Sequence, residues 1–140
     1  NVKAVQADAT KLNSDWIDKF DFVLADAPCS CLGTYRKHPD VFLTRKESDI
    51  SELAHTQNSI AQNALAYLKT GGVMIYSTCT LFKEENDDVV DALVKSGKAV
   101  LEHIDCDNID GGKYAGNVGK IQILPHAEYD GFYIAKLRKI

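Results

Sequence analysis

An open α/β sheet is the fold that this sequence predicts, because two short apolar runs flank a segment with helical periodicity. The runs are Phe22–Ala25 and Val73–Tyr76, and each has the length and continuity of a strand buried on both faces. Between them, apolar residues recur at helical spacing from Ile50 to Leu68. A strand, a crossover helix and a second strand indicate two parallel strands of one sheet.

The chain begins in the middle of this alternating pattern. Its first residue is Asn1 rather than Met, and Val2–Val5 already has the apolar content of a strand. We therefore interpret the 140 residues as one domain, or part of one, taken from a longer protein. Gly71 is the expected stop of the helix that precedes the second apolar run.

A second helix is predicted after Thr80. Its apolar stripe lies within Val89–Val94, and Gly97 is placed to end it. Glu84 and Glu85 would interact favourably with the positive end of the helix dipole.

Two further strands are expected near the end of the chain, at Val100–Leu101 and Phe132–Ala135. The glycine-rich stretch Gly111–Gly119 is interpreted as a long loop between them. Strands and helices thus alternate along the whole chain, which favours the α/β class.

Composition limits the classes of function. No apolar run approaches the roughly 20 residues of a membrane span, and no basic-then-apolar leader opens the chain, so we expect a cytoplasmic protein. The net charge of -4 counts against an RNA partner, unless basic surface lies elsewhere in a longer protein. The four cysteines are expected to be free thiols, catalytic groups or metal ligands rather than disulfides.

Both predicted parallel strands are followed by a cysteine. Ligands of open α/β sheets bind beyond the carboxyl ends of the strands, and neighbouring strands lie about 4.8 Å apart. The first strand ends in Asp26–Ser30 and the second in Ser77–Thr80. If these strands are neighbours, Cys29, Cys79 and the carboxylate of Asp26 surround one site.

Several kinds of chemistry fit such a pair of thiols. A thiolate is a nucleophile, and a helix amino terminus, expected near Cys79, lowers the pKa of a thiol. Free cysteines are also common as small buried hydrophobic residues, and this is what we expect of Cys31 and Cys106. A zinc site would use Cys29, Cys31 and Cys79. Their spacing matches no C-x-x-C or H-x-x-x-H pattern, so we expect no metal.

Asp26–Ser30 and Ser77–Thr80 resemble the two cysteine motifs of RNA cytosine-5 methyltransferases. The resemblance spans nearly all 140 residues and is greatest to the bacterial Sun/Fmu-type ribosomal RNA methyltransferases. It also includes Arg36–Asp40, Leu68–Gly72, Glu84–Asn86 and Asp130–Leu137. The second motif, with its Thr-Cys pair, indicates RNA rather than DNA as the substrate. Cys31 and Tyr35 depart from the pattern, which usually has a small and an aliphatic residue at these positions.

The resemblance implies a class I S-adenosylmethionine-dependent (Rossmann-like) sheet that lacks its first two strands. All residues from 1 to 140 would form the carboxyl-terminal part of the catalytic domain, without the glycine-rich loop that holds the cofactor. The strand near Phe132 would run antiparallel between two others. Val2–Gln6 should then be frayed, re-paired or docked on another molecule, and the chain alone should transfer no methyl group.

The resemblance also implies roles for individual residues. Cys79 would attack C6 of cytosine, and Cys29 would serve product release. Asp26 would stabilise the base ring and lie near the amino group of the cofactor, while the backbone carbonyl of Pro28 would face the exocyclic amine.

Asp8 corresponds to a carboxylate on the adenine amino group, although an ordinary turn aspartate fits equally well. Arg36, Lys37 and Lys136 are candidates for phosphate contacts, or solvated surface charges. The expected substrate is ribosomal RNA. A transfer RNA methyltransferase and a non-catalytic RNA-binding or ribosome-assembly module on the same fold are the alternatives.

Overall fold

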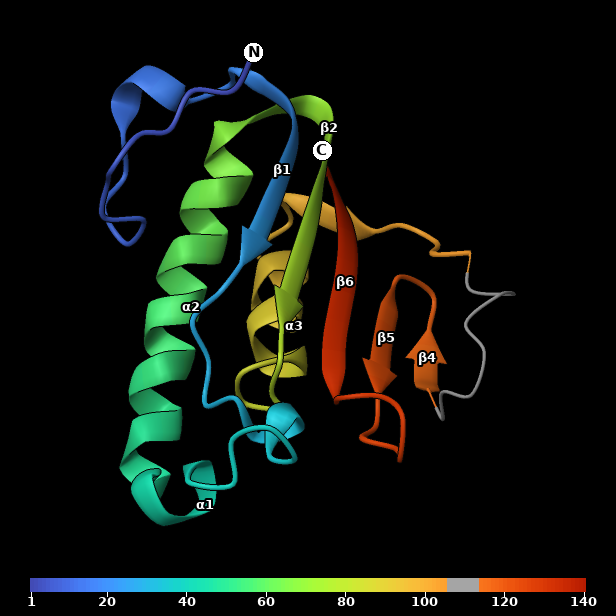
Figure 1. The fold of residues 1–140 in the computed structure, drawn as a ribbon. Coiled ribbons are helices and arrows are strands. Elements are labelled where there is room, and N and C mark those ends of the chain that lie inside the picture. Colours follow the sequence, from blue (N-terminus) through green and yellow to red (C-terminus); the bar gives the residue numbers. More distant parts are fainter. Residues whose placement is uncertain (106–113) are drawn as a thin grey trace.

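The predicted sheet forms the centre of the molecule (Figure 1). The computed structural model describes residues 1–105 and 114–140. Within these residues the strands are β1 (Phe20–Asp26), β2 (Leu68–Thr78), β3 (Ala99–Leu101), β4 (Tyr114–Asn117), β5 (Lys120–Ile123) and β6 (Phe132–Lys139). The helices are α1 (Val41–Thr44), α2 (Glu47–Tyr67) and α3 (Asp87–Lys95), with 3-10 turns at Ser14–Trp16 and Leu32–Thr34.

The strand order is β1-β2-β6-β5-β4, and β3 also pairs with β6. β1 and β2 are parallel neighbours, with Asp26 opposite Ser77 at their carboxyl ends. This confirms the strand–helix–strand prediction. β6 runs antiparallel to β2 on one side and to β5 and β3 on the other, as the resemblance implied.

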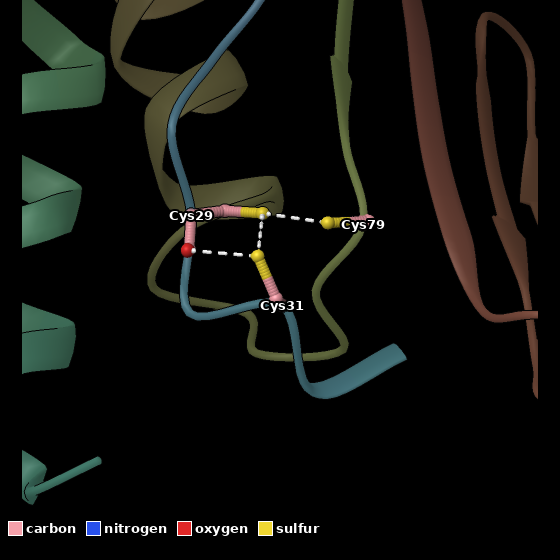
Figure 2. A group of neighbouring side chains, drawn as sticks. All are labelled: Cys29, Cys31 and Cys79. Atoms are coloured by element: carbon pink, nitrogen blue, oxygen red, sulfur yellow. Dashed lines mark hydrogen bonds between the residues drawn. The ribbon is translucent and has the colours of Figure 1, made fainter. Parts of the chain in front are cut away.

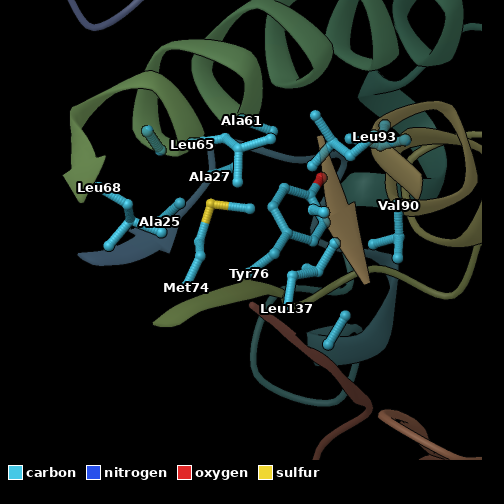
Figure 3. Close-up of a cluster of buried hydrophobic side chains, with 14 of the residues drawn as sticks. Ala25, Ala27, Ala61, Leu65, Leu68, Met74, Tyr76, Val90, Leu93 and Leu137 are labelled. Carbon is cyan, nitrogen blue, oxygen red and sulfur yellow. The ribbon is translucent and has the colours of Figure 1, made fainter. Parts of the chain in front are cut away.

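The hydrophobic core lies between the sheet and the two longer helices (Figure 3). Alternate residues of each strand point to this face, because side chains alternate along a strand. The core residues include Ala25, Ala61, Leu65, Met74, Tyr76, Val90, Leu93, Ala135 and Leu137. The apolar stripe predicted for α3 is thus confirmed. None of the helices formed by the described residues has the length and apolar character that a membrane span needs.

β1 differs from the prediction that it is buried on both faces. It is the edge strand of the sheet, and the exposed fractions of Phe22 and Leu24 are 56% and 62%. The predicted strand at Val2–Val5 does not form either, and Val2 is 95% exposed. The expectation that this segment is frayed therefore agrees with the structure.

Gly71 does not end α2, which stops at Tyr67, four residues earlier than expected. The buried side chain of Leu68 already belongs to β2, and Gly71 takes a φ of +82° inside that strand. The register between β1 and β2 shifts at this point, from Phe20 opposite Leu68 to Phe22 opposite Val73. Gly71 thus supplies the left-handed backbone of an irregularity in the strand.

Two other sequence expectations also need correction. Within Gly111–Gly119 the described residues are not a loop, because β4 and β5 form an antiparallel hairpin with Gly119 at its turn. The first turn of α3 contains Asp87 and Asp88, whereas Glu84 and Glu85 precede the helix.

Candidate active site

The two predicted cysteine loops meet at the carboxyl edge of β1 and β2 (Figure 2). The backbone N–H of Ala27 donates to the Ser77 carbonyl at 3.0 Å, which carries the strand pairing one residue past Asp26. Beyond it, the Sγ atoms of Cys29 and Cys79 are 3.2 Å apart. The prediction that these two thiols meet at this edge of the sheet is confirmed.

Cys31 brings a third sulfur to the same place, although the sequence analysis favoured a buried hydrophobic role for it over a place in a three-cysteine site. Its Sγ lies 4.0 Å from Cys29 Sγ and donates a hydrogen bond to the Cys29 carbonyl at 3.3 Å. The φ of Cys31 is 62°, so a left-handed residue turns the chain back towards Cys29. Cys31 is half-buried rather than a buried hydrophobic residue. Cys106 lies outside the described residues.

The hydrogen bond between the two closest thiols shifts their pKa values in opposite directions. The hydrogen bond from Cys79 lowers the pKa of Cys29 to about 6. The same hydrogen bond raises the pKa of Cys79, and burial adds to the increase. The first proton of the pair is therefore lost more easily than from an isolated thiol, and the second is held on Cys79.

A buried carboxylate ties both cysteine loops together. Glu85 is fully buried, and its oxygens accept hydrogen bonds from Ser30 N at 2.8 Å, Ser30 Oγ at 2.6 Å and Thr80 Oγ1 at 2.8 Å. Ser30 follows Cys29 and Thr80 follows Cys79, so one side chain fixes the two loops relative to each other. Sequence reasoning missed this role, although a hydroxyl residue directly after each cysteine was visible.

Gln57 of α2 completes the buried network. Its Nε2 donates to the Glu85 carboxylate at 2.9 Å and to the Pro28 carbonyl at 2.8 Å. Both partners are acceptors, which fixes the orientation of the amide. One of the two lone pairs of the Pro28 carbonyl is thus already used.

Asn86, just before α3, forms side-chain hydrogen bonds to the second cysteine loop. Its Oδ1 accepts a hydrogen bond from Thr78 Oγ1 at 2.6 Å, and its Nδ2 donates to the Thr80 carbonyl at 3.1 Å. Because Cys79 lies between these two residues, the buried Asn86 side chain holds its backbone in place. Asn86 therefore orients the loop through side-chain hydrogen bonds.

Asp26 lies at the carboxyl end of β1, whereas Asp8 lies in a turn along α2. Asp26 is exposed at the end of β1, and its Oδ1 accepts a hydrogen bond from Ser77 Oγ at 2.8 Å. Asp8 Oδ1 accepts hydrogen bonds from the backbone and side chain of Thr10, which lower the pKa of Asp8. The backbone carbonyl of Ala9 accepts a hydrogen bond from the Asn63 side chain, so this turn lies along the carboxyl-terminal half of α2 (Figure 1).

The candidate phosphate-binding residues already have internal partners. Arg36 donates to the His126 carbonyl, and Lys37 forms an ion pair with Asp130. Both basic side chains remain exposed while they hold the segment before β6. Lys136 pairs with Glu102 at 3.1 Å.

The described residues form only part of a binding site for S-adenosylmethionine. Asp26 has an exposed carboxylate at the edge where such a ligand would bind, but Asp8 is held in its own turn. A hollow of about 330 Å³ along the exposed side of β1 is lined by Trp16, Leu24 and neighbouring apolar residues. The lining of this hollow includes neither Asp8 nor Asp26.

Comparisons with known proteins show the family of this chain. The family model described as 16S rRNA methyltransferase RsmB/F matches residues 1–138. The chain belongs to this family. Ribosomal RNA small subunit methyltransferase B of Yersinia enterocolitica is 42% identical over 122 residues, which are 86% of this chain and 27% of the relative. The Shewanella oneidensis protein of the same name is 37% identical, over 98% of this chain and 31% of its own length.

Solved structures support the same assignment. NSun6 from Pyrococcus horikoshii, solved with the S-adenosylmethionine analogue SFG, matches 99% of this chain with a TM-score of 0.80 and 38% identity. The match covers 35% of that protein. The structure of PH0851 matches 88% of this chain, with a TM-score of 0.79 and 29% identity, and the match covers 27% of that protein. The fold is therefore a partial class I methyltransferase sheet, and the chain spans about a quarter to a third of its relatives.

Proposed function

We propose that this chain carries the catalytic thiols of a cytosine-5 methyltransferase that modifies 16S ribosomal RNA. The 3.2 Å contact between Cys29 Sγ and Cys79 Sγ, in a chain of the RsmB/F family, is the observation that carries the proposal. Two thiols in contact at the carboxyl edge of a methyltransferase sheet support an enzyme over a non-catalytic RNA-binding module.

The chemistry requires a nucleophile, because C5 of cytosine attacks a methyl group poorly. In the proposed reaction Cys79 sulfur adds to C6, and the electrons of the C5–C6 double bond move into the ring and make C5 electron-rich. S-adenosylmethionine, when bound, supplies an electrophilic methyl group. C5 takes that methyl group and then loses its proton, while the bond between C6 and Cys79 sulfur breaks and restores the ring.

Cys29 is suited to the proton steps of this sequence. Its sulfur lies next to the attacking sulfur and can act as the base that takes the C5 proton at release. Glu85 would be a positioning residue for both thiols, since it binds the residue after each cysteine.

The neighbouring groups would bind the base and the RNA. Asp26, oriented by Ser77, can stabilise the ring when electron density moves towards N3. The second lone pair of the Pro28 carbonyl can accept from the exocyclic amine. Arg36 and Lys37 are exposed and can contact phosphates, and Asp8 would reach the cofactor only if its turn rearranges.

A chimaera tests this function, because the chain spans less than a third of its relatives. The chain would replace the matching segment of the Shewanella oneidensis relative, and methyl transfer from labelled S-adenosylmethionine to 16S ribosomal RNA would be measured. We expect activity in the chimaera, its loss in Cys79→Ala, and none in the 140-residue chain alone. Full activity of Cys79→Ala, or labelling of transfer RNA instead, would contradict the proposal.

A further inference from the structure

We propose that Cys29, Cys31 and Cys79 form a zinc-binding site with three sulfur ligands and an open fourth position. The three sulfurs come from two loops that follow neighbouring strands, and Figure 2 shows them pointing towards one another. They all lie within 4.8 Å of one another. The inference goes beyond methyl transfer, because it requires neither RNA nor the rest of a methyltransferase.

The spacing of the sulfurs is close to that of a zinc site. A Zn–S distance of about 2.3 Å in a tetrahedron places neighbouring sulfurs about 3.8 Å apart. The separation of Cys29 and Cys31 is 4.0 Å, and that of Cys29 and Cys79 is 3.2 Å. Side-chain rotations that move each sulfur by less than about 1 Å would complete one face of the tetrahedron.

The kind of donor selects the metal. Three thiols without a carboxylate favour a soft or borderline ion such as Zn²⁺ over Mg²⁺ or Ca²⁺. Cys31 and Cys79 are only half-buried, so an ion can reach the sulfurs from solvent. Solvent can then occupy the fourth position, as it does in zinc sites with three protein ligands.

Cys31 is the residue that turns a pair of thiols into a possible metal site. Its left-handed backbone is uncommon for a residue other than glycine, and it aims the sulfur back at Cys29. The spacing of these cysteines matches no zinc pattern along the sequence, because the pairing of β1 with β2 brings Cys79 to the other two. Zinc would use both sulfurs proposed for catalysis, and would therefore compete with cytosine for Cys79.

Metal binding by the reduced 140-residue chain tests the site directly. Titration with Co²⁺ should produce sulfur-to-cobalt charge-transfer absorption, and added Zn²⁺ should displace it at a ratio of one ion per chain. Competition with a chromophoric chelator then gives the zinc affinity. Absence of thiolate-to-cobalt absorption in the folded chain would overturn the proposal.

Variants identify the ligands. Cys31→Gly suits the left-handed backbone, so circular dichroism should show an intact fold. Zinc binding should nevertheless weaken by about tenfold or more, since even loss of a hydrogen bond to a metal ligand has an effect of that size. Cys29→Ala and Cys79→Ala should weaken it too. Cys106→Ala is the matched control and should bind as tightly as the original chain. Unchanged affinity in Cys31→Gly, or a loss confined to Cys106→Ala, would contradict the site.

Discussion

The carboxyl end of β1 and the outer side of β1 lie in very different surroundings. At its carboxyl end, the cysteine loops are joined by Glu85, whose side chain is fully buried and accepts hydrogen bonds from both loops. Along its outer side, Leu24 is 62% exposed, and the segment before it contains no strand. The described residues therefore hold the two cysteine loops by internal hydrogen bonds, but provide few of the contacts expected around a cofactor.

This difference separates two parts of the proposed reaction. The nucleophile and its neighbouring thiol are positioned by hydrogen bonds within the chain, from Gln57 on α2 to Asn86 at the start of α3. The chain spans about a quarter to a third of the length of its relatives, and we expect cofactor binding to need more than its own residues. The thiol site should therefore form and react without methyl transfer.

The largest effect on stability is expected when a core leucine is compared with a leucine on the outer side of β1. Leu65→Ala removes a side chain that is 3% exposed and should lower the free energy of unfolding by about 2–5 kcal/mol. Leu24→Ala, on the exposed side of β1, should lower it by less than about 1 kcal/mol. Urea denaturation of the chain measures both. Similar losses would mean that the outer side of β1 is covered in solution.

Neighbouring glutamates provide the next comparison. Glu85→Ala leaves the Ser30 N–H and the Gln57 amide without their carboxylate, which should reduce stability by about 2–3 kcal/mol. It should also slow the alkylation of the two active-site thiols, and by different amounts, because their loops separate. Glu84→Ala changes an exposed residue and should stay within about 0.5 kcal/mol of the original. Equal stabilities would show that the buried network does not hold the loops.

The smallest effect is expected at the basic surface. Lys37→Ala removes an exposed ion pair with Asp130 and should change stability by less than about 1 kcal/mol. If Lys37 contacts a phosphate, RNA binding by the chimaera should weaken and its log–log salt dependence should lose a slope of about 1. An unchanged slope of the salt dependence would show that Lys37 holds the segment before β6 and does not contact a phosphate.

Much of the fold could be predicted because its signals are local. The apolar runs at Phe22–Ala25 and Val73–Tyr76 and the helical pattern between them gave the parallel pair and hence the meeting of Cys29 and Cys79. Burial of β1 on both faces could not be judged in the same way. That property depends on which elements cover the strand, and β1 is an edge here.

The position of the third thiol was misjudged, and the buried carboxylate was missed, for a different reason. The position of Cys31 depends on a positive φ that propensities do not predict for cysteine. Glu85 was expected to interact with the positive end of the helix dipole, but α3 begins two residues later and Glu85 is buried. Glu85 binds Ser30, 55 positions away in the sequence, and Thr80, five positions away. Hydrophobic periodicity does not reveal such contacts.

The most direct test of the central claim is the covalent intermediate that divides the roles of the two thiols. In the chimaera, Cys29→Ala should allow attack and methyl transfer but block release, so an RNA–protein adduct linked through Cys79 should accumulate. Denaturing electrophoresis with labelled RNA would show it as a shifted band. Cys79→Ala should give neither product nor adduct. A trapped band in Cys79→Ala instead would reverse the two roles, and full activity in both variants would show that the thiols are structural.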